Sequence, residues 1–91
     1  MDVKDLKEKS EVDELIVQVM EKKEVIETDR YRTCDVVGED KTGRVTVTLW
    51  NEQTSLFEEG DVIVVKKGWC KSYKDQLSVS SGKNGTIEKV D

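Results

Sequence analysis

Gly43-Arg44-Val45-Thr46-Val47-Thr48-Leu49-Trp50 is the stretch that decides the fold. Apolar and polar residues alternate strictly along it, which is the period of a β-strand with one buried face. One face is apolar throughout and is expected to enter a core: Val45, Val47 and Leu49. The other face is mostly polar but ends in an aromatic residue: Arg44, Thr46, Thr48 and Trp50. Because an indole ring loses much by facing water, this outer face predicts a binding surface.

The same pattern recurs after Gly68, where Trp69, Lys71 and Tyr73 share one face of another strand. Aromatic residues are otherwise scarce in this chain. Two strands therefore present flat rings beside cationic side chains. That combination suits an unstacked nucleic-acid strand, whose bases stack on rings while its phosphates contact Lys and Arg.

Outward from these strands, the pattern predicts a single domain over residues 1–91. Residues 1–14 are expected to form an N-terminal arm packing on a barrel, either as a helical turn or extended. Strands are expected at residues 15–20, 31–37, 44–50, 62–65 with a continuation past a bend at Gly68, and 77–80. The segment 51–61 predicts a short helix, capped by Asn51 and closed by Gly60. Five strands with a helix between the third and fourth is the element order of an all-β, five-stranded Greek-key barrel, the OB fold.

Composition excludes several classes of function. The 91 residues include two cysteines, far apart at Cys34 and Cys70, and no histidine, so an internal structural zinc site is not expected. We expect both cysteines to be small core residues. No histidine base, glycine-rich phosphate loop or activated nucleophile is present, so we expect neither an enzyme nor a cofactor. No leader peptide and no membrane-spanning apolar run is evident, and we expect an intracellular, cytoplasmic and nucleoid-associated protein.

The charge is acidic overall but unevenly distributed. The net charge is −5, yet residues 62–91 carry six basic and three acidic side chains. The acidic balance lies in residues 1–61, where a dense run of acids, Glu8, Glu11, Asp13 and Glu14, is interpreted as a solvated face. An acidic whole lowers non-specific affinity for nucleic acid, while the local charge beside the aromatics favours it.

The chain resembles the OB domains of archaeal replication protein A and of simple single-stranded DNA-binding proteins. The motifs that carry this resemblance follow one another along nearly the whole chain: Val3-Lys4-Asp5-Leu6-Lys7, Arg32-Thr33-Cys34-Asp35-Val36, Asp40-Lys41-Thr42-Gly43, Leu49-Trp50-Asn51-Glu52, Glu59-Gly60-Asp61-Val62-Ile63, Lys67-Gly68-Trp69 with Tyr73, and Gly82-x-x-Gly85-x-Ile87-x-x-Val90. Family members usually carry a proline in the opening segment and another before strand four, whereas this chain has none.

The resemblance implies that Trp50, Trp69 and Tyr73 stack on DNA bases. Nearby basic residues are candidate phosphate or base contacts: Arg32, Arg44, Lys71 and Lys74. Of these, Arg44 shares a predicted face with Trp50, and Arg32 depends on strand register because a slip of one residue would turn it away. Tyr31 and Lys83 are weaker candidates, and Phe57 is expected to pack beneath the helix.

The expected function is binding of single-stranded DNA with little sequence preference, in replication, repair or recombination. Expected partners are single-stranded DNA and, in a longer chain, other OB domains or replication and repair proteins; no membrane partner is expected. Two alternatives stay open: an RNA-binding OB module, because stacking tolerates either sugar, and a protein-interaction OB domain, which the acidity favours.

Overall fold

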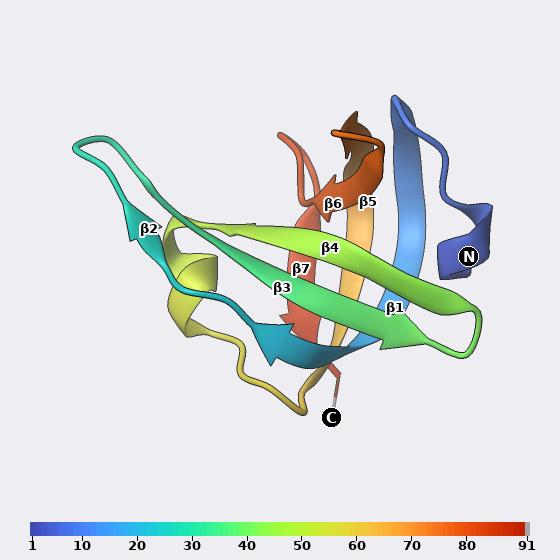
Figure 1. Ribbon diagram of the computed structural model, residues 1–91, viewed down its shortest axis with the longest axis horizontal. Coiled ribbons are helices and arrows are strands. Elements are labelled where there is room, and N and C mark those ends of the chain that lie inside the picture. The colour runs from blue at the N-terminus through green and yellow to red at the C-terminus, as the bar shows by residue number, and fades with distance from the viewer. Residues whose placement is uncertain (91) are drawn as a thin grey trace.

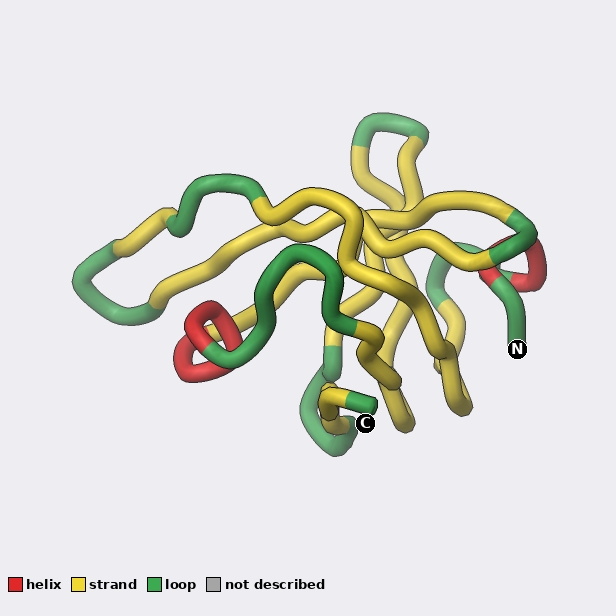
Figure 2. Tube along the Cα trace, turned by 90° about the horizontal axis from the view of Figure 1, so that it is seen from below, coloured by secondary structure: helices red, strands yellow, loops and turns green. Residues whose placement is uncertain are grey.

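The computed structural model describes residues 1–90. Two single-turn 3₁₀ helices and seven strands follow one another along the chain: η1 (Val3–Asp5), β1 (Ser10–Lys22), β2 (Ile26–Glu27), β3 (Arg32–Asp40), β4 (Gly43–Trp50), η2 (Asn51–Ser55), β5 (Val62–Tyr73), β6 (Gln76–Ser80) and β7 (Thr86–Lys89). The helices are confined to the two short turns drawn red in Figure 2.

Five of the strands close into a barrel in the order β1-β3-β4-β6-β5, and β1 pairs with β5 to complete the ring. Every pairing is antiparallel except that of β4 with β6, which is parallel. The remaining strands are extensions, since β2 pairs with β3 and β7 pairs with β5. Figure 1 shows the segment carrying β2, residues 23–31, projecting from one end of the barrel; we call it the β2 arm. The expected five-stranded OB barrel is confirmed.

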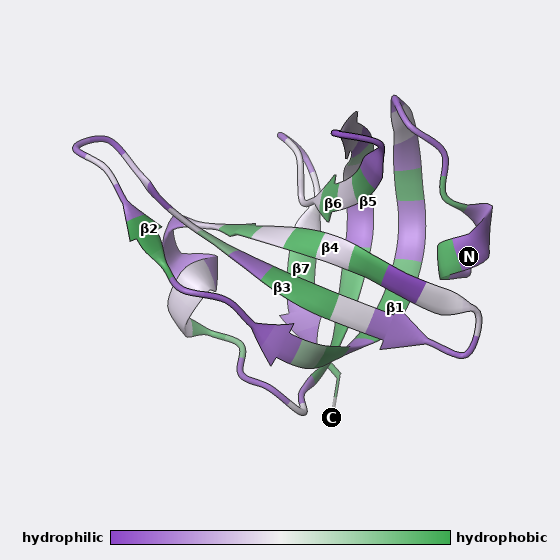
Figure 3. Ribbon diagram, viewed as in Figure 1, coloured by the Kyte–Doolittle hydropathy of each residue, from purple (hydrophilic) through white to green (hydrophobic). Residues whose placement is uncertain are grey.

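The core lies inside the ring and is built from alternate residues of each strand. Val45, Val47 and Leu49 are buried as the alternation of β4 predicts, and the alternation is visible as bands along β4 in Figure 3. Phe57 is buried as expected. Cys34 and Cys70 are also buried, and burial is the main cause that raises the pKa of each thiol. Both are therefore protonated core residues at neutral pH.

The first strand begins earlier than expected, at Ser10 rather than near residue 15. Residues 10–14 of the expected arm thus belong to the barrel, where Ser10 lies opposite Cys70 of β5. Only the segment before them is an arm: η1 forms one turn and Leu6 is buried. Sequence periodicity missed the start of β1 because its inward positions change phase, from Val12 to Leu15, and this breaks the alternation.

The expected helix after β4 is the single 3₁₀ turn η2, which ends at Ser55 and not at Gly60. Asn51 is its first residue and has a positive φ of 53°, while its side chain accepts a hydrogen bond from the Arg32 amide (3.1 Å). It therefore ties η2 to β3, and its expected role as the helix cap was wrong.

The expected bend in β5 is confirmed. Inward positions run through Ile63 and Val65 and resume at Gly68, while Lys67 takes a positive φ of 52°. A Cβ on Gly68 would lie 2.5 Å from the carbonyl oxygen of Ser80, so no larger side chain fits. The bend turns Trp69 outward. No helix within residues 1–90 is both long and apolar enough to cross a membrane.

Candidate nucleic-acid interface

An aromatic platform stands where β4 meets the base of the β2 arm. Trp50 ends β4 with 37% of its surface exposed, as its place on the outer face predicts. Its ring centroid lies 5.2 Å from that of Tyr31, with the planes inclined by 56°. The two rings support one another in the tilted arrangement that aromatic pairs favour. The contact with Tyr31 therefore favours the outward orientation of Trp50.

The second group of rings lies on the β5–β6 hairpin. Trp69 and Tyr73 are 41% and 67% exposed, Lys71 between them is exposed too, and Cys70 faces the core. The predicted shared face of β5 is therefore confirmed. Lys74 follows in the turn, and its Nζ lies 5.4 Å from the centroid of the Tyr73 ring, within the range of a cation–π contact.

A hollow of about 330 Å³, which we call the hairpin hollow, lies beside this hairpin. Its floor crosses three strands, since Thr46 of β4 lies opposite Ser78 of β6, and Ser78 lies opposite Lys71 of β5. Tyr73 lines it from the hairpin and Lys23 from the β2 arm. A stacking ring and two cations thus surround one cavity.

A second, larger hollow of about 700 Å³ surrounds Trp69, and we call it the Trp69 hollow. Lys67, Lys71 and Lys83 line it together with the indole. Two carboxylates of β1 line it as well, Glu11 and Asp13. Lys71 is common to both hollows and therefore joins them into one path along the hairpin.

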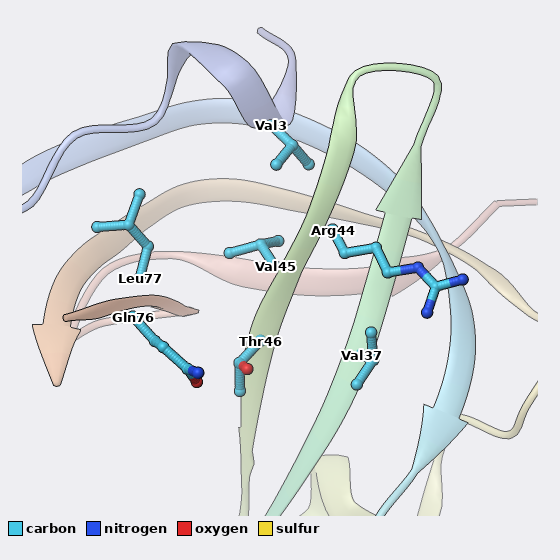
Figure 4. Close-up of a pocket in the computed structure, with 7 residues that line it drawn as sticks. All are labelled: Val3, Val37, Arg44, Val45, Thr46, Gln76 and Leu77. Atoms are coloured by element: carbon cyan, nitrogen blue, oxygen red, sulfur yellow. The ribbon is translucent and has the colours of Figure 1, made fainter. Parts of the chain in front are cut away.

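A third hollow, of about 340 Å³, continues the hairpin hollow past Thr46, Gln76 and Leu77 (Figure 4). Val3 of η1 closes it, and the Val3 amide donates a hydrogen bond to Asp40 Oδ2 (2.8 Å). The N-terminal turn therefore forms part of the wall of this third hollow.

Arg44 lines this third hollow but is already engaged. Its Nε lies 3.2 Å from Oε2 of Glu39, which is directly opposite it on β3. Figure 4 shows the guanidinium extending toward β3 and away from Gln76. A phosphate that bound Arg44 would have to compete with this carboxylate.

Arg32 lies apart from the hairpin. It is two residues before the buried Cys34, and so the alternation of β3 places it on the opposite face from Thr33, the partner of Trp50. It lines a depression of about 230 Å³ formed with Tyr31, Asn51 and residues 27–30 of the β2 arm. The structure thus groups Lys71, Tyr73 and Lys74 with Trp69, and leaves Trp50, Arg44 and Arg32 at the ends of β4 and the base of the arm.

Two charged lining residues of the hairpin hollow were not predicted, Lys23 and Asp35. Lys23 sits in a polar run with no alternation to give it a face. Asp35 was noticed only as part of a motif, although its position one residue after Cys34 already places it on the outer face of the strand.

Comparison with known proteins agrees with this architecture. The single-stranded DNA-binding protein Ssb of Saccharolobus solfataricus is 28% identical over 77 residues, which cover 82% of this chain and 51% of that protein. The chain thus spans about half the length of the curated relative that it matches.

Solved structures share the fold. The replication factor A related protein of Methanobacterium thermoautotrophicum superposes with a TM-score of 0.79 at 24% identity, over 100% of this chain and 90% of that one. Schizosaccharomyces pombe Pot1pC, solved with bound single-stranded DNA, gives a TM-score of 0.69 at 17% identity, over 100% and 86%. At these identities the likeness concerns the fold alone.

The family assignment rests on a longer match. Residues 6–89 match the family described as "Single-stranded DNA binding protein Ssb-like, OB fold", and this range includes all five barrel strands and both hairpin aromatics. The chain belongs to the Ssb-like family of OB-fold single-stranded DNA-binding proteins.

Proposed function

We propose that this domain binds single-stranded DNA by stacking bases on Trp50, Trp69 and Tyr73. The observation that carries the proposal is the placement of these rings: all three are exposed on the outside of the barrel, and lysines flank two of them. Stacking accepts every base because every base has a π-face, and this limits sequence preference. A domain of this type occludes roughly 4–16 nucleotides.

Basic side chains supply the second contribution to binding, which is the neutralisation of phosphates. Lys71 and Lys74 lie beside the hairpin rings, and Arg44 stands at the start of β4. Arg32 lies apart from them, at the base of the β2 arm, and would contact only a strand that extends that far. Neutralising a phosphate releases condensed counterions, so affinity falls as salt rises. The net charge of −5 repels the DNA polyanion, and this repulsion lowers affinity most at low ionic strength, where screening is weakest. Tandem copies of such a domain in one chain would gain affinity through effective concentration.

The test is a titration with a fluorescent oligo-dT of about 12 nucleotides, a length within the expected site size, read by anisotropy. Trp50→Ala, Trp69→Ala and Tyr73→Ala should each weaken binding by about 1–3 kcal/mol, the usual contribution of one stacked base. Ile16→Ala is the matched control. Ile16 is also a large exposed side chain, but it lies on β1 and lines neither the hairpin hollow nor the Trp69 hollow.

Three outcomes of this titration would count against the proposal or narrow it. If the folded wild-type protein does not bind at low salt, the proposal is wrong, and the result favours the alternative of a protein-interaction module. If an RNA of matching sequence competes as well as DNA, the surface does not distinguish the sugars. If the three aromatic variants bind as tightly as Ile16→Ala, stacking at these rings is excluded.

A further inference from the structure

The hairpin hollow contains a polar chain that neither stacking nor phosphate binding uses. Asp35 projects from β3 and its Oδ1 accepts a hydrogen bond from the Thr48 hydroxyl (3.0 Å). Thr48 Oγ1 lies 3.0 Å from the hydroxyl of Ser78. Because the Thr48 proton points to the carboxylate, Ser78 donates to Thr48, and the three side chains form a directed row across β3, β4 and β6.

The Asp35 carboxylate keeps free acceptor capacity. Thr48 occupies one lone pair of Oδ1, and a carboxylate has about four such sites. The ion pairs formed within residues 1–90 engage Glu39, Glu58 and Asp61, so Asp35 is not neutralised by a cation at contact distance. Asp35 is exposed and lines the hollow, and its remaining lone pairs are therefore available to a ligand.

The residues around Asp35 are of the types that can hold a nucleotide. Tyr73 offers a stacking face, while Lys23 and Lys71 approach the hollow from the arm side and from the β5 side. A phosphate beside the carboxylate would be repelled, so phosphates are drawn to the two lysines at the edges. The part of the nucleotide that meets Asp35 is then the edge of the base.

We propose that Asp35 is a specificity-determining residue that reads the base in the hairpin hollow; this rests on the proposed function. A carboxylate only accepts hydrogen bonds, so it favours bases with an exocyclic amino group. Cytosine presents N4–H, adenine N6–H and guanine N2–H, and each of these can donate to Asp35. Thymine presents two carbonyl oxygens around a single N3–H, and those oxygens repel the carboxylate. The domain therefore prefers cytosine to thymine at this one subsite, while the other stacking positions stay indifferent.

The experiment compares three labelled oligomers of about 12 nucleotides, a length within the range that one domain occludes. The first is oligo-dT, the second replaces alternate thymines with cytosine, and the third replaces the same thymines with 2-pyrimidinone, a cytosine analogue that lacks the amino group. The wild-type protein should bind the cytosine oligomer about 3- to 10-fold more tightly than oligo-dT, within the range that the usual net contribution of one hydrogen bond gives. It should bind the 2-pyrimidinone oligomer no better than oligo-dT.

Asp35→Asn supplies the decisive variant because a carboxamide both donates and accepts. It can pair with the thymine O4 or with the cytosine N4–H, so the preference should fall below about 2-fold while binding persists. Asp35→Ala checks the result without any polar group at this position. Glu88→Gln is the matched control. It removes an exposed carboxylate from β7, which pairs with residues 63–66 of β5 and not with the part of β5 that lines the hollow, and it should keep the wild-type preference.

The outcomes separate the two proposals. If no oligomer binds to the folded wild-type protein, the proposed function fails and this inference fails with it. If all three oligomers bind with equal affinity, or if Asp35→Asn and Asp35→Ala keep the wild-type preference for cytosine, the role of Asp35 is overturned while DNA binding stands. A preference that disappears in both Asp35 variants and survives in Glu88→Gln supports it.

Discussion

Replacing Lys71 with alanine should weaken DNA binding, and the loss of affinity should become smaller as the salt concentration rises. Lys71 lines both the hairpin hollow and the Trp69 hollow, so a strand that passes from one to the other must run beside its ammonium group. Each phosphate contact on a single strand contributes about 0.7 to the slope of log K against log salt. Loss of one contact therefore costs about 5-fold in affinity at about 0.1 M salt, and only about 1.6-fold at about 0.5 M.

The assay is the anisotropy titration repeated at four or more salt concentrations between these limits, with oligo-dT as the ligand. The matched control is Lys89→Ala, whose Nζ lies 3.4 Å from Asp61 on the β7 side of the barrel. Lys89 is exposed and lines neither the hairpin hollow nor the Trp69 hollow, so the variant should keep both the wild-type affinity and slope. An unchanged slope in Lys71→Ala, or an equal loss in Lys89→Ala, would refute the assignment of a phosphate to Lys71.

Three further predictions concern neighbouring positions. Glu39→Gln should tighten oligo-dT binding by about 2- to 5-fold at low salt, because it releases Arg44 from an ion pair of 3.2 Å and removes a negative charge; weaker binding in the same titration would contradict this. Gly85→Ala should destabilise the fold by about 1–3 kcal/mol, because the added Cβ would lie within 2.6 Å of three backbone carbonyl oxygens. The change is read from the midpoint of urea unfolding. A midpoint equal to that of the wild type would show that the loop after β6 relaxes freely. Asp75→Gly should stabilise the domain by about 0.5–1 kcal/mol in the same urea experiment, because Asp75 holds a φ of 65° that glycine adopts without strain; a lower midpoint would mean that the aspartate side chain supports the turn.

Local pattern was enough to predict the faces of the strands. Alternation along residues 43–50 placed Trp50 outward and Leu49 inward, and both assignments are confirmed by their exposure. It also placed Trp69 and Tyr73 on one face of β5, with the bend at Gly68 before them. These successes share a cause: side chains alternate across any extended strand, so the face of a residue follows from its immediate neighbours.

Strand boundaries were less accessible where the alternation failed. The start of β1 at Ser10 was hidden by a phase change that occurs opposite the positive φ of Lys67 on β5. The distortion belongs to the paired strands together, and neither sequence segment displays it alone.

The sequence by itself determined the fold class, the outward aromatics and the supply of cations near them, because all three follow from residue type and local period. Only the tertiary structure decided which of those groups meet. The parallel pairing of β4 with β6 brings Thr46 beside Ser78, and closure of the barrel brings Asp35 and Lys71 to one hollow. It also gives Arg44 a carboxylate partner on β3. These neighbours come from different strands of a closed ring, and their meeting depends on a register and a closure that no single strand encodes.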